Sequence, residues 1–144
     1  MYLEKLYENP RGRYSRWFSF ENPQGEKGKA AMVKEGLKGA AMKVIEPGER
    51  VTLISCEGPG IFQQLWIGYM DFAGRDISTM DRVGIFRLDL FWEGEDRPAV
   101  SAPLDEFFCQ PAWPYKRPFE NALFSNPEGR SLNCFVPMPF QRRA

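Results

Sequence analysis

The chain has 144 residues, of which 43% are hydrophobic and 15% aromatic, enough to form one domain with a core of its own. Its 19 basic and 19 acidic residues cancel, so no overall field draws it to nucleic acid or to an anionic membrane surface, and we expect neither as a partner. The absence of histidine excludes a Ser-His-Asp triad, a Cys-His pair and any zinc site that needs imidazole. Acid–base chemistry near neutral pH therefore falls to carboxylates or lysine.

The three cysteines predict reduced, buried thiols. Cys56, Cys109 and Cys134 are odd in number and far apart, which fits neither a zinc knuckle nor a framework of disulfides. No apolar stretch approaches the roughly 20 residues of a membrane helix, and residues 1–13 lack the apolar core of a signal peptide. We therefore expect a cytoplasmic chain with no cofactor and no metal.

The first half of the chain predicts strands separated by turns. Aromatic residues in 14–20 favour a strand, and a charged, glycine-containing loop follows. A short strand is expected at 42–46, ending in a turn at Pro47-Gly48-Glu49. Residues 50–56 alternate in polarity, and 61–69 form the next expected strand. The glycines that flank Pro59 predict a sharp reversal, so these two strands form either a hairpin or a crossing between sheets.

The second half contains the clearest strand pattern. Residues 83–92 place Phe86, Leu88, Leu90 and Trp92 on one face and charged residues on the other, as in a half-buried strand. A turn over 93–96 leads to an extended run, 99–104, bounded by prolines that suit an edge strand. With 131–136, about seven strands result, and no convincing long helix appears. This pattern predicts an all-β, antiparallel β-sandwich occupying residues 1–144 as a single domain.

Four blocks of sequence resemble one known family. They are residues 15–25 (SRWFSFENPQG), 51–66 (VTLISCEGPGIFQQLW), 91–108 (FWEGEDRPAVSAPLDEFF) and 133–140 (NCFVPMPF). The third block is similar to the W-D-G-E-x-x-P-S-V-x-x-P-L-G-D-F-F signature of the DUF2961 proteins, grouped as glycoside hydrolase family 172. The blocks occur in the order of that family, and they resemble its N-terminal portion.

The resemblance implies a fold and a chemistry. Members of this family are double jelly-roll proteins that cleave fructofuranosyl or arabinofuranosyl linkages by a retaining mechanism with two glutamates. They assemble as trimers or larger rings, and their chains are longer than this one. The resemblance therefore implies a jelly-roll sandwich that is incomplete relative to the family, a glycan containing fructose or arabinose as ligand, and a homo-oligomer, possibly a trimer. It also implies that the catalytic glutamates lie outside this chain, so we assign no catalytic residue.

Departures from the family pattern bear on the candidate residues. The aspartate after the signature tryptophan is Glu93 here, the glycine before the acidic position is Asp105, and the acid itself is Glu106. Glu93 is interpreted as part of a solvated turn, and Glu57 as an acceptor of backbone N–H groups within its own turn. For Glu106, a structural or sugar-hydroxyl hydrogen bond is favoured over proton transfer.

Four residues are the candidate substrate contacts: Asn22, Glu106, Asn133 and Trp113. The first three are polar positions within the matched blocks. Trp113 belongs to a proline-rich aromatic loop, 109–129, of the kind that forms functional walls or interface arms. An alternative to the incomplete hydrolase is a small β-sandwich that binds carbohydrate or mediates oligomer assembly without catalysis. A third possibility is that the chain itself hydrolyses furanosides with Glu106 and a second acid.

Overall fold

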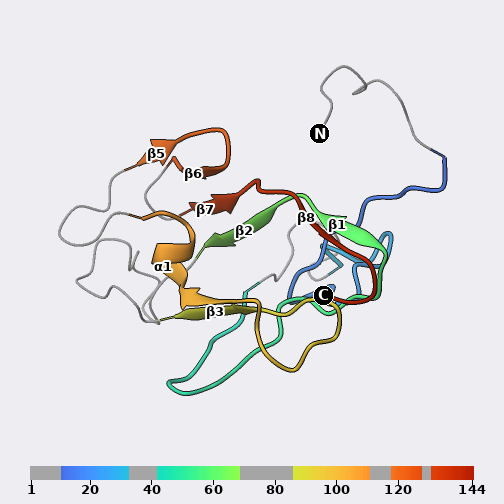
Figure 1. The fold of residues 1–144 in the computed structure, drawn as a ribbon, viewed down its shortest axis with the longest axis horizontal. Coiled ribbons are helices and arrows are strands. Elements are labelled where there is room, and N and C mark those ends of the chain that lie inside the picture. Colours follow the sequence, from blue (N-terminus) through green and yellow to red (C-terminus); the bar gives the residue numbers. More distant parts are fainter. Residues whose placement is uncertain (1–10, 33–41, 69–85, 111–117, 128–130) are drawn as a thin grey trace. The chain divides into compact units, whose positions relative to one another are not determined.

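A computed structural model describes residues 11–32, 42–68, 86–110, 118–127 and 131–144 (Figure 1). The chain divides into two compact units, Met1–Ser55 and Cys56–Ala144, called here the first and the second unit. All helices and strands of the described residues lie in the second unit.

The described part of the first unit is built from turns. Ser19 and Asn22 exchange backbone hydrogen bonds of 3.2 and 3.0 Å in a single antiparallel bridge. The expected turn at Pro47-Gly48 is confirmed: the Glu49 N–H donates to the Glu46 carbonyl at 2.9 Å, and Gly48 has a φ of 83°. Lys43, before the turn, forms an ion pair with Glu49, with 2.8 Å between Nζ and Oε1.

The strands expected at 14–20, 42–46 and 50–56 are wrong, since the described residues there form no strand. Alternation predicts which side chains should be buried, but a strand also needs a neighbour that accepts its hydrogen bonds. Tyr14 and Trp17 remain 76% and 55% exposed instead of facing a core. At the end of the stretch 50–56, Cys56 and Ala144 exchange two backbone hydrogen bonds, and Glu57 and Arg143 form an isolated β-bridge. This pairing is too short to count as a strand.

The second unit contains three antiparallel sheets and one short helix (Figure 1). One sheet has four strands in the order β2-β7-β6-β5, and two others pair β1 with β8 and β3 with β4. The bounds are β1 Gly60–Phe62, β2 Leu65–Gly68, β3 Arg87–Leu90, β4 Val100–Pro103, α1 Leu104–Phe107, β5 Phe119–Glu120, β6 Phe124–Asn126, β7 Ser131–Cys134 and β8 Met138–Phe140.

The strand expected over 61–69 is split in two. Its first part, β1, pairs with β8 in the register Phe62↔Met138, and its second part, β2, pairs with β7 in the register Leu65↔Cys134. Two residues separate β1 from β2, whereas three separate β7 from β8, so the register shifts by one residue at this point. Pro137, which has no N–H to donate, lies in the longer segment. Residues 50–56 form no strand, so the hairpin, one of the two expected alternatives, does not form among the described residues, and β1 and β2 pair instead with β8 and β7.

The hairpin of β3 and β4 confirms the central part, 87–90, of the strand expected over 83–92, whose residues 83–85 lie outside the described residues. Leu88 is 7% exposed and Arg87 is exposed, as the alternation predicts. The turn is closed by bonds from the Glu95 N–H to the Trp92 carbonyl and from the Ala99 N–H to the Leu90 carbonyl. β4 pairs with β3 alone, in a two-stranded sheet. The single turn of α1 follows β4 directly.

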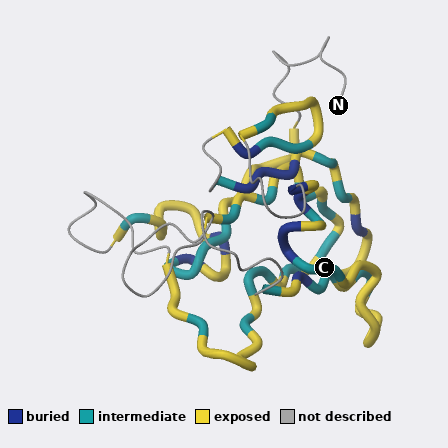
Figure 2. The backbone as a smooth tube through the Cα atoms, turned by 90° about the vertical axis from the view of Figure 1, so that its left-hand side faces the viewer, coloured by how far each residue is buried: buried dark blue, intermediate teal, exposed yellow. Residues whose placement is uncertain are grey.

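The buried hydrophobic residues of the described chain are few and belong to the second unit; they are Leu88, Leu104, Phe108, Leu132, Cys134 and Phe140. Figure 2 shows the buried residues as short dark-blue runs separated by intermediate and exposed ones. Phe108, at 1% exposure, ends α1 and packs edge-on against Phe107 with 5.0 Å between ring centroids. The described elements are thus nearly all β and antiparallel, which confirms the predicted class and is consistent with a β-sandwich.

Candidate functional site

Asn22 organises a compact loop in the first unit. Its side chain is 5% exposed, and its amide bonds the backbone on both sides: Nδ2 donates to the carbonyls of Trp17 and Glu26 at 3.4 and 3.0 Å, and Oδ1 accepts the Glu26 N–H at 3.0 Å. Gly25 completes the turn with a φ of 60°, where a Cβ would lie 3.0 Å from the Phe18 ring. These bonds use the amide to hold the loop, and a role for Asn22 in contacting substrate stays a prediction.

Glu106 and its neighbour Asp105 lie in α1, with opposite exposure. Glu106 is exposed, while Asp105 is 5% exposed. The helix begins after Pro103 and ends where Cys109 adopts a φ of 57°, with the Gln110 N–H bonded to the Asp105 carbonyl at 2.8 Å. The Gln110 side chain is buried, and neither of its polar atoms has a hydrogen-bond partner. Within the described part of the chain, the Glu106 side chain thus lies at the surface.

Asn133 lies on β7, in the four-stranded sheet. It is 7% exposed; its Nδ2 donates to the Ser131 carbonyl at 2.8 Å, and its Oδ1 accepts from Gln64 Nε2 at 3.2 Å. Trp66, directly opposite on β2, donates from Nε1 to Ser131 Oγ at 2.8 Å. Asn133 thus holds the exposed side-chain amide of Gln64, two residues before the exposed indole of Trp66. Trp113, the fourth candidate, lies outside the described residues.

The third matched block and the end of the chain form one cluster, which we call the tail clasp: Trp92, Glu93 and residues 139–143. Trp92 Nε1 donates to the Pro139 carbonyl at 2.9 Å. The Glu93 carboxylate accepts the N–H groups of Gln141 and Arg142, both at 2.8 Å. The Glu93 N–H in turn donates to the Arg143 carbonyl at 2.7 Å. Glu93 lies in a turn, as interpreted, and its side chain is 32% exposed, but both of its carboxylate oxygens also accept hydrogen bonds from backbone N–H groups of the tail.

Two glycines of the second matched block make room for the same tail. A Cβ on Gly58 would lie 2.5 Å from the Gln141 carbonyl oxygen, and a Cβ on Gly60 would lie 2.6 Å from Cζ of Phe140. Phe140 is 4% exposed and packs against Phe62 with 5.1 Å between ring centroids. The matched blocks 51–66, 91–108 and 133–140 therefore meet at the tail clasp, where their glycines and acid have a structural role.

The backbone of the tail keeps the Glu93 carboxyl ionised. The backbone N–H groups of Gln141 and then Arg142 hold the pKa of the Glu93 carboxyl below its ordinary value, with a smaller contribution from the Arg142 charge. A carboxyl that remains ionised cannot serve as a proton donor near neutral pH. Oε1 of Glu57 lies 3.6 Å from Nε of Arg143, so this side chain, 80% exposed, pairs with the tail; its acceptance of N–H groups from its own turn stays a prediction.

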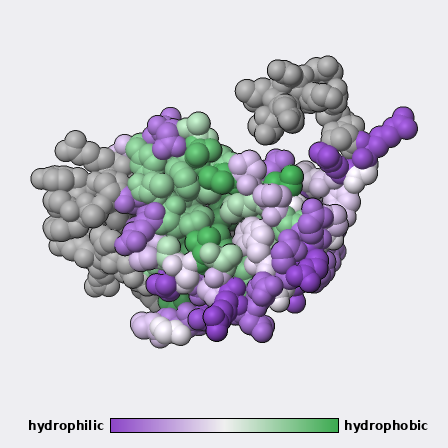
Figure 3. Space-filling view, in the orientation of Figure 1, coloured by the Kyte–Doolittle hydropathy of each residue, from purple (hydrophilic) through white to green (hydrophobic). Residues whose placement is uncertain are grey.

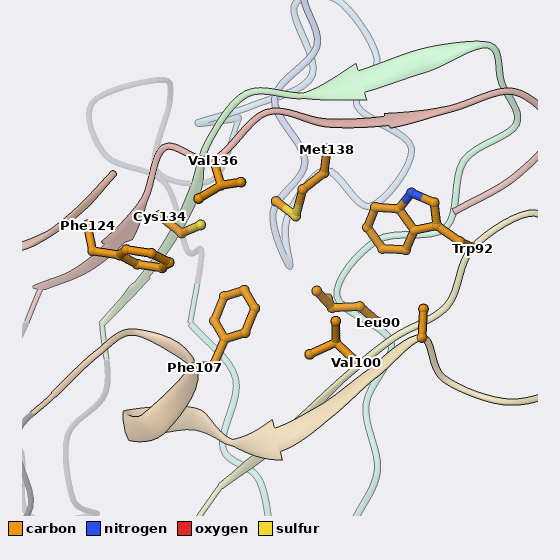
Figure 4. A pocket seen from close by; sticks show the side chains of 9 residues that line it. Leu90, Trp92, Val100, Phe107, Phe124, Cys134, Val136 and Met138 are labelled. Atoms are coloured by element: carbon orange, nitrogen blue, oxygen red, sulfur yellow. The ribbon is translucent and has the colours of Figure 1, made fainter. Parts of the chain in front are cut away.

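A pocket of about 380 Å³ lies in the second unit, between the α1–β4 segment and the segment from β6 to β8 (Figure 4). Its lining is almost wholly apolar and consists of Leu90, Trp92, Ala99, Val100, Phe107, Phe124, Cys134, Val136 and Met138. Figure 3 shows hydrophobic side chains gathered over the region between α1 and β7. A site for sugar hydroxyls needs several convergent polar groups, which this lining does not supply.

The cysteines differ in environment but form no disulfide, and all three are described. Cys134 is buried and lines the pocket, and desolvation raises the pKa of its thiol. Cys56 is half-buried and Cys109 is exposed, contrary to the expectation that all three thiols are buried. Within the described ranges, no group of three or more acidic or cysteine side chains could hold a metal ion.

Sequence reasoning missed the sheet row that contains Trp66. The ladder places Trp66, Asn133 and Ser125 side by side on β2, β7 and β6, and Glu120 on β5 lies next to Ser125. A single strand over 61–69 gave no register, so the partners of Trp66 across the sheet were not predictable. The sequence did contain one signal: Trp66 lies between Leu65 and Ile67, so the indole is expected on the face of the sheet opposite to these two apolar side chains.

The fold and the clasp together define an antiparallel all-β domain with a tail held by glycines and one glutamate. A sequence model described as GH172 domain-like matches residues 37–144, three quarters of the chain. The chain therefore belongs to this family of glycoside-hydrolase-related domains, as the sequence blocks indicated. The block at 15–25 precedes the matched range. No curated protein and no solved structure matches the chain. Among the described residues, no helix is long and apolar enough to cross a membrane.

Proposed function

We propose that the chain is the N-terminal jelly-roll portion of a furanoside-cleaving glycoside hydrolase, in which it binds the glycan and does not itself supply a complete catalytic pair. Its ligand is a glycan containing fructose or arabinose, its catalytic glutamates lie outside this chain, and it works in the cytoplasm as part of a homo-oligomer. Residues 1–144 form one sandwich in this proposal, with Asn22, Glu106, Asn133 and Trp113 as candidate contacts.

The observation that carries the proposal is the tail clasp. A retaining glycosidase needs two carboxyl groups about 5 Å apart, one of them protonated. Glu93, the acid that follows the signature tryptophan, instead binds two backbone N–H groups and stays ionised. Glu57 is paired with Arg143 on the surface, and the pocket contains no carboxylate. Glu93 and Glu57 thus have roles that favour structure over proton transfer.

A hydrolysis assay tests the proposal. The chain is incubated with aryl arabinofuranosides and with fructo-oligosaccharides, and released sugar is measured by chromatography. We expect no release above that of the E106Q variant, which keeps the shape of the Glu106 side chain but removes its charge. Sustained release by the unaltered chain that is abolished in E106Q would show that the chain itself is a complete enzyme and would refute the proposal.

The apolar pocket favours a second function, assembly of an oligomer without catalysis. Val100 lines the pocket and is 38% exposed. If another subunit covers this apolar lining, the removal of its surface from water favours association by about 25 cal/mol per Å². Light scattering coupled to size-exclusion chromatography measures the oligomer. The V100E variant should shift it toward the monomer, whereas the V44E variant, at an exposed valine of the first unit, should not. A monomeric unaltered chain would remove this function.

A further inference from the structure

We infer that the outer face of the four-stranded sheet is a carbohydrate-binding platform centred on Trp66, an inference that rests on the proposed function. The register places Trp66, Asn133, Ser125 and Glu120 in one row across β2, β7, β6 and β5. Successive residues of a strand face opposite sides. Since Cys134, the residue after Asn133, lines the apolar pocket, the row faces away from it.

Trp66 supplies an apolar surface that is held in place. The residue is 53% exposed, yet its only polar atom, Nε1, is bonded to Ser131 Oγ at 2.8 Å. What Trp66 presents to solvent is therefore the carbon surface of the indole. Gly68, opposite Ser131, has no side chain to compete for the space beside the ring. A fixed aromatic ring loses little entropy on binding and suits the C–H face of a sugar ring.

Polar groups follow the indole along the row. The buried Asn133 amide uses Oδ1 to hold the exposed Gln64, whose amide keeps further hydrogen-bonding capacity. Ser125 and Glu120 continue the row with a hydroxyl and a carboxylate. Asn133 is thus a positioning residue, and Gln64, Ser125 and Glu120 are the polar contacts.

The charge of the row selects the ligand class. Glu120 is its single charged residue and is negative, so a phosphate or a uronic acid is disfavoured, while neutral hydroxyl groups can donate to the carboxylate. Strands lie about 4.8 Å apart, so the distance from the strand of Trp66 to that of Glu120 is about 14 Å. This length fits a short neutral oligosaccharide rather than a single sugar.

Calorimetric titration with fructo- and arabino-oligosaccharides tests the platform. We expect W66A to bind at least about tenfold more weakly than the unaltered chain, the loss typical of removing an aromatic anchor, and W66F to lie between them. W17A is the matched control, because Trp17 is equally exposed, at 55%, but belongs to the first unit. Its affinity should be unchanged. The affinity of the unaltered chain should also not vary with salt, because the ligand is neutral.

A measurement on the unaltered chain guards against a misfolded variant. In a ¹H-¹⁵N NMR spectrum, the indole N–H signal of Trp66, assigned by its loss in W66F, should move on titration, and that of Trp17 should not. Equal affinity of W66A, or an unmoved Trp66 signal during saturable binding, would overturn the platform while carbohydrate binding stands. No heat with any of the oligosaccharides would overturn carbohydrate binding by this chain together with the platform.

Discussion

The substitution Gly60→Ala tests whether the contact between β1 and β8 holds the second unit together. The new Cβ would lie 2.6 Å from Cζ of Phe140, 3.0 Å from Cε1 and 3.3 Å from Cε2. The ring cannot easily move away, because it is 4% exposed and packs against Phe62, while Gly58 approaches its Cδ2 edge. Overpacking of this kind costs about 1–3 kcal/mol. We expect G60A to lower the free energy of unfolding by this amount.

A double-mutant cycle in urea measures the cost. The variant F140L shortens the side chain that the new methyl group would meet, so adding G60A to F140L should cost at least about 1 kcal/mol less than adding it to the unaltered chain. The control I61A changes the next residue of β1, which is 54% exposed, and should stay within about 0.5 kcal/mol. An equal cost of G60A in both backgrounds would refute the steric reasoning.

Three further predictions concern single side chains. Because the pKa of the Glu93 carboxyl is lowered on folding, Glu93 stabilises the fold above about pH 4.5, and this stabilisation is lost as pH falls through the lower pKa of the folded state. The difference in urea stability between the unaltered chain and E93Q should therefore be largest at pH 7 and vanish in strong acid. A pH-independent difference would contradict this. Iodoacetamide should modify the exposed Cys109 well before Cys134, whose burial raises the pKa of its thiol; mass spectrometry of peptides gives the order, and equal rates would contradict it. N22A should destabilise the loop of the first unit by about 1–3 kcal/mol, because buried backbone groups lose their partners; proteolysis in urea measures this, with Q24A at an exposed position of the same loop as control, and equal cleavage of both variants would be the contrary result.

Local patterns predicted the parts of the fold whose partners are close in sequence. The hairpin of β3 and β4 followed from the alternation before Trp92 and from prolines that limit the next run, and Pro47-Gly48 specified its turn. Three other expected strands failed, because alternation cannot identify a partner. The part of the chain that pairs with residues 56–68 is instead the segment 131–144, between 63 and 88 residues further along.

The same distance explains what was missed at the site. Glu93 looks like a turn residue when only its neighbours are considered, yet its two hydrogen-bond partners lie 48 and 49 residues away. The row of Trp66 depends on the one-residue shift in register between the β1–β8 and β2–β7 pairs, which hydrophobicity does not encode. The family itself was recognisable from its blocks, three of which contain residues of the clasp or the glycines beside it.

The central claim is that this domain binds a furanose-containing glycan without cleaving it, and one calorimetric titration with fructo- and arabino-oligosaccharides tests both parts. Binding gives heat that saturates and returns to the baseline after each injection, whereas hydrolysis displaces the baseline for as long as substrate remains. The account predicts saturable heat with a restored baseline. No heat with either glycan, or a displaced baseline in proportion to the amount of protein, would contradict it.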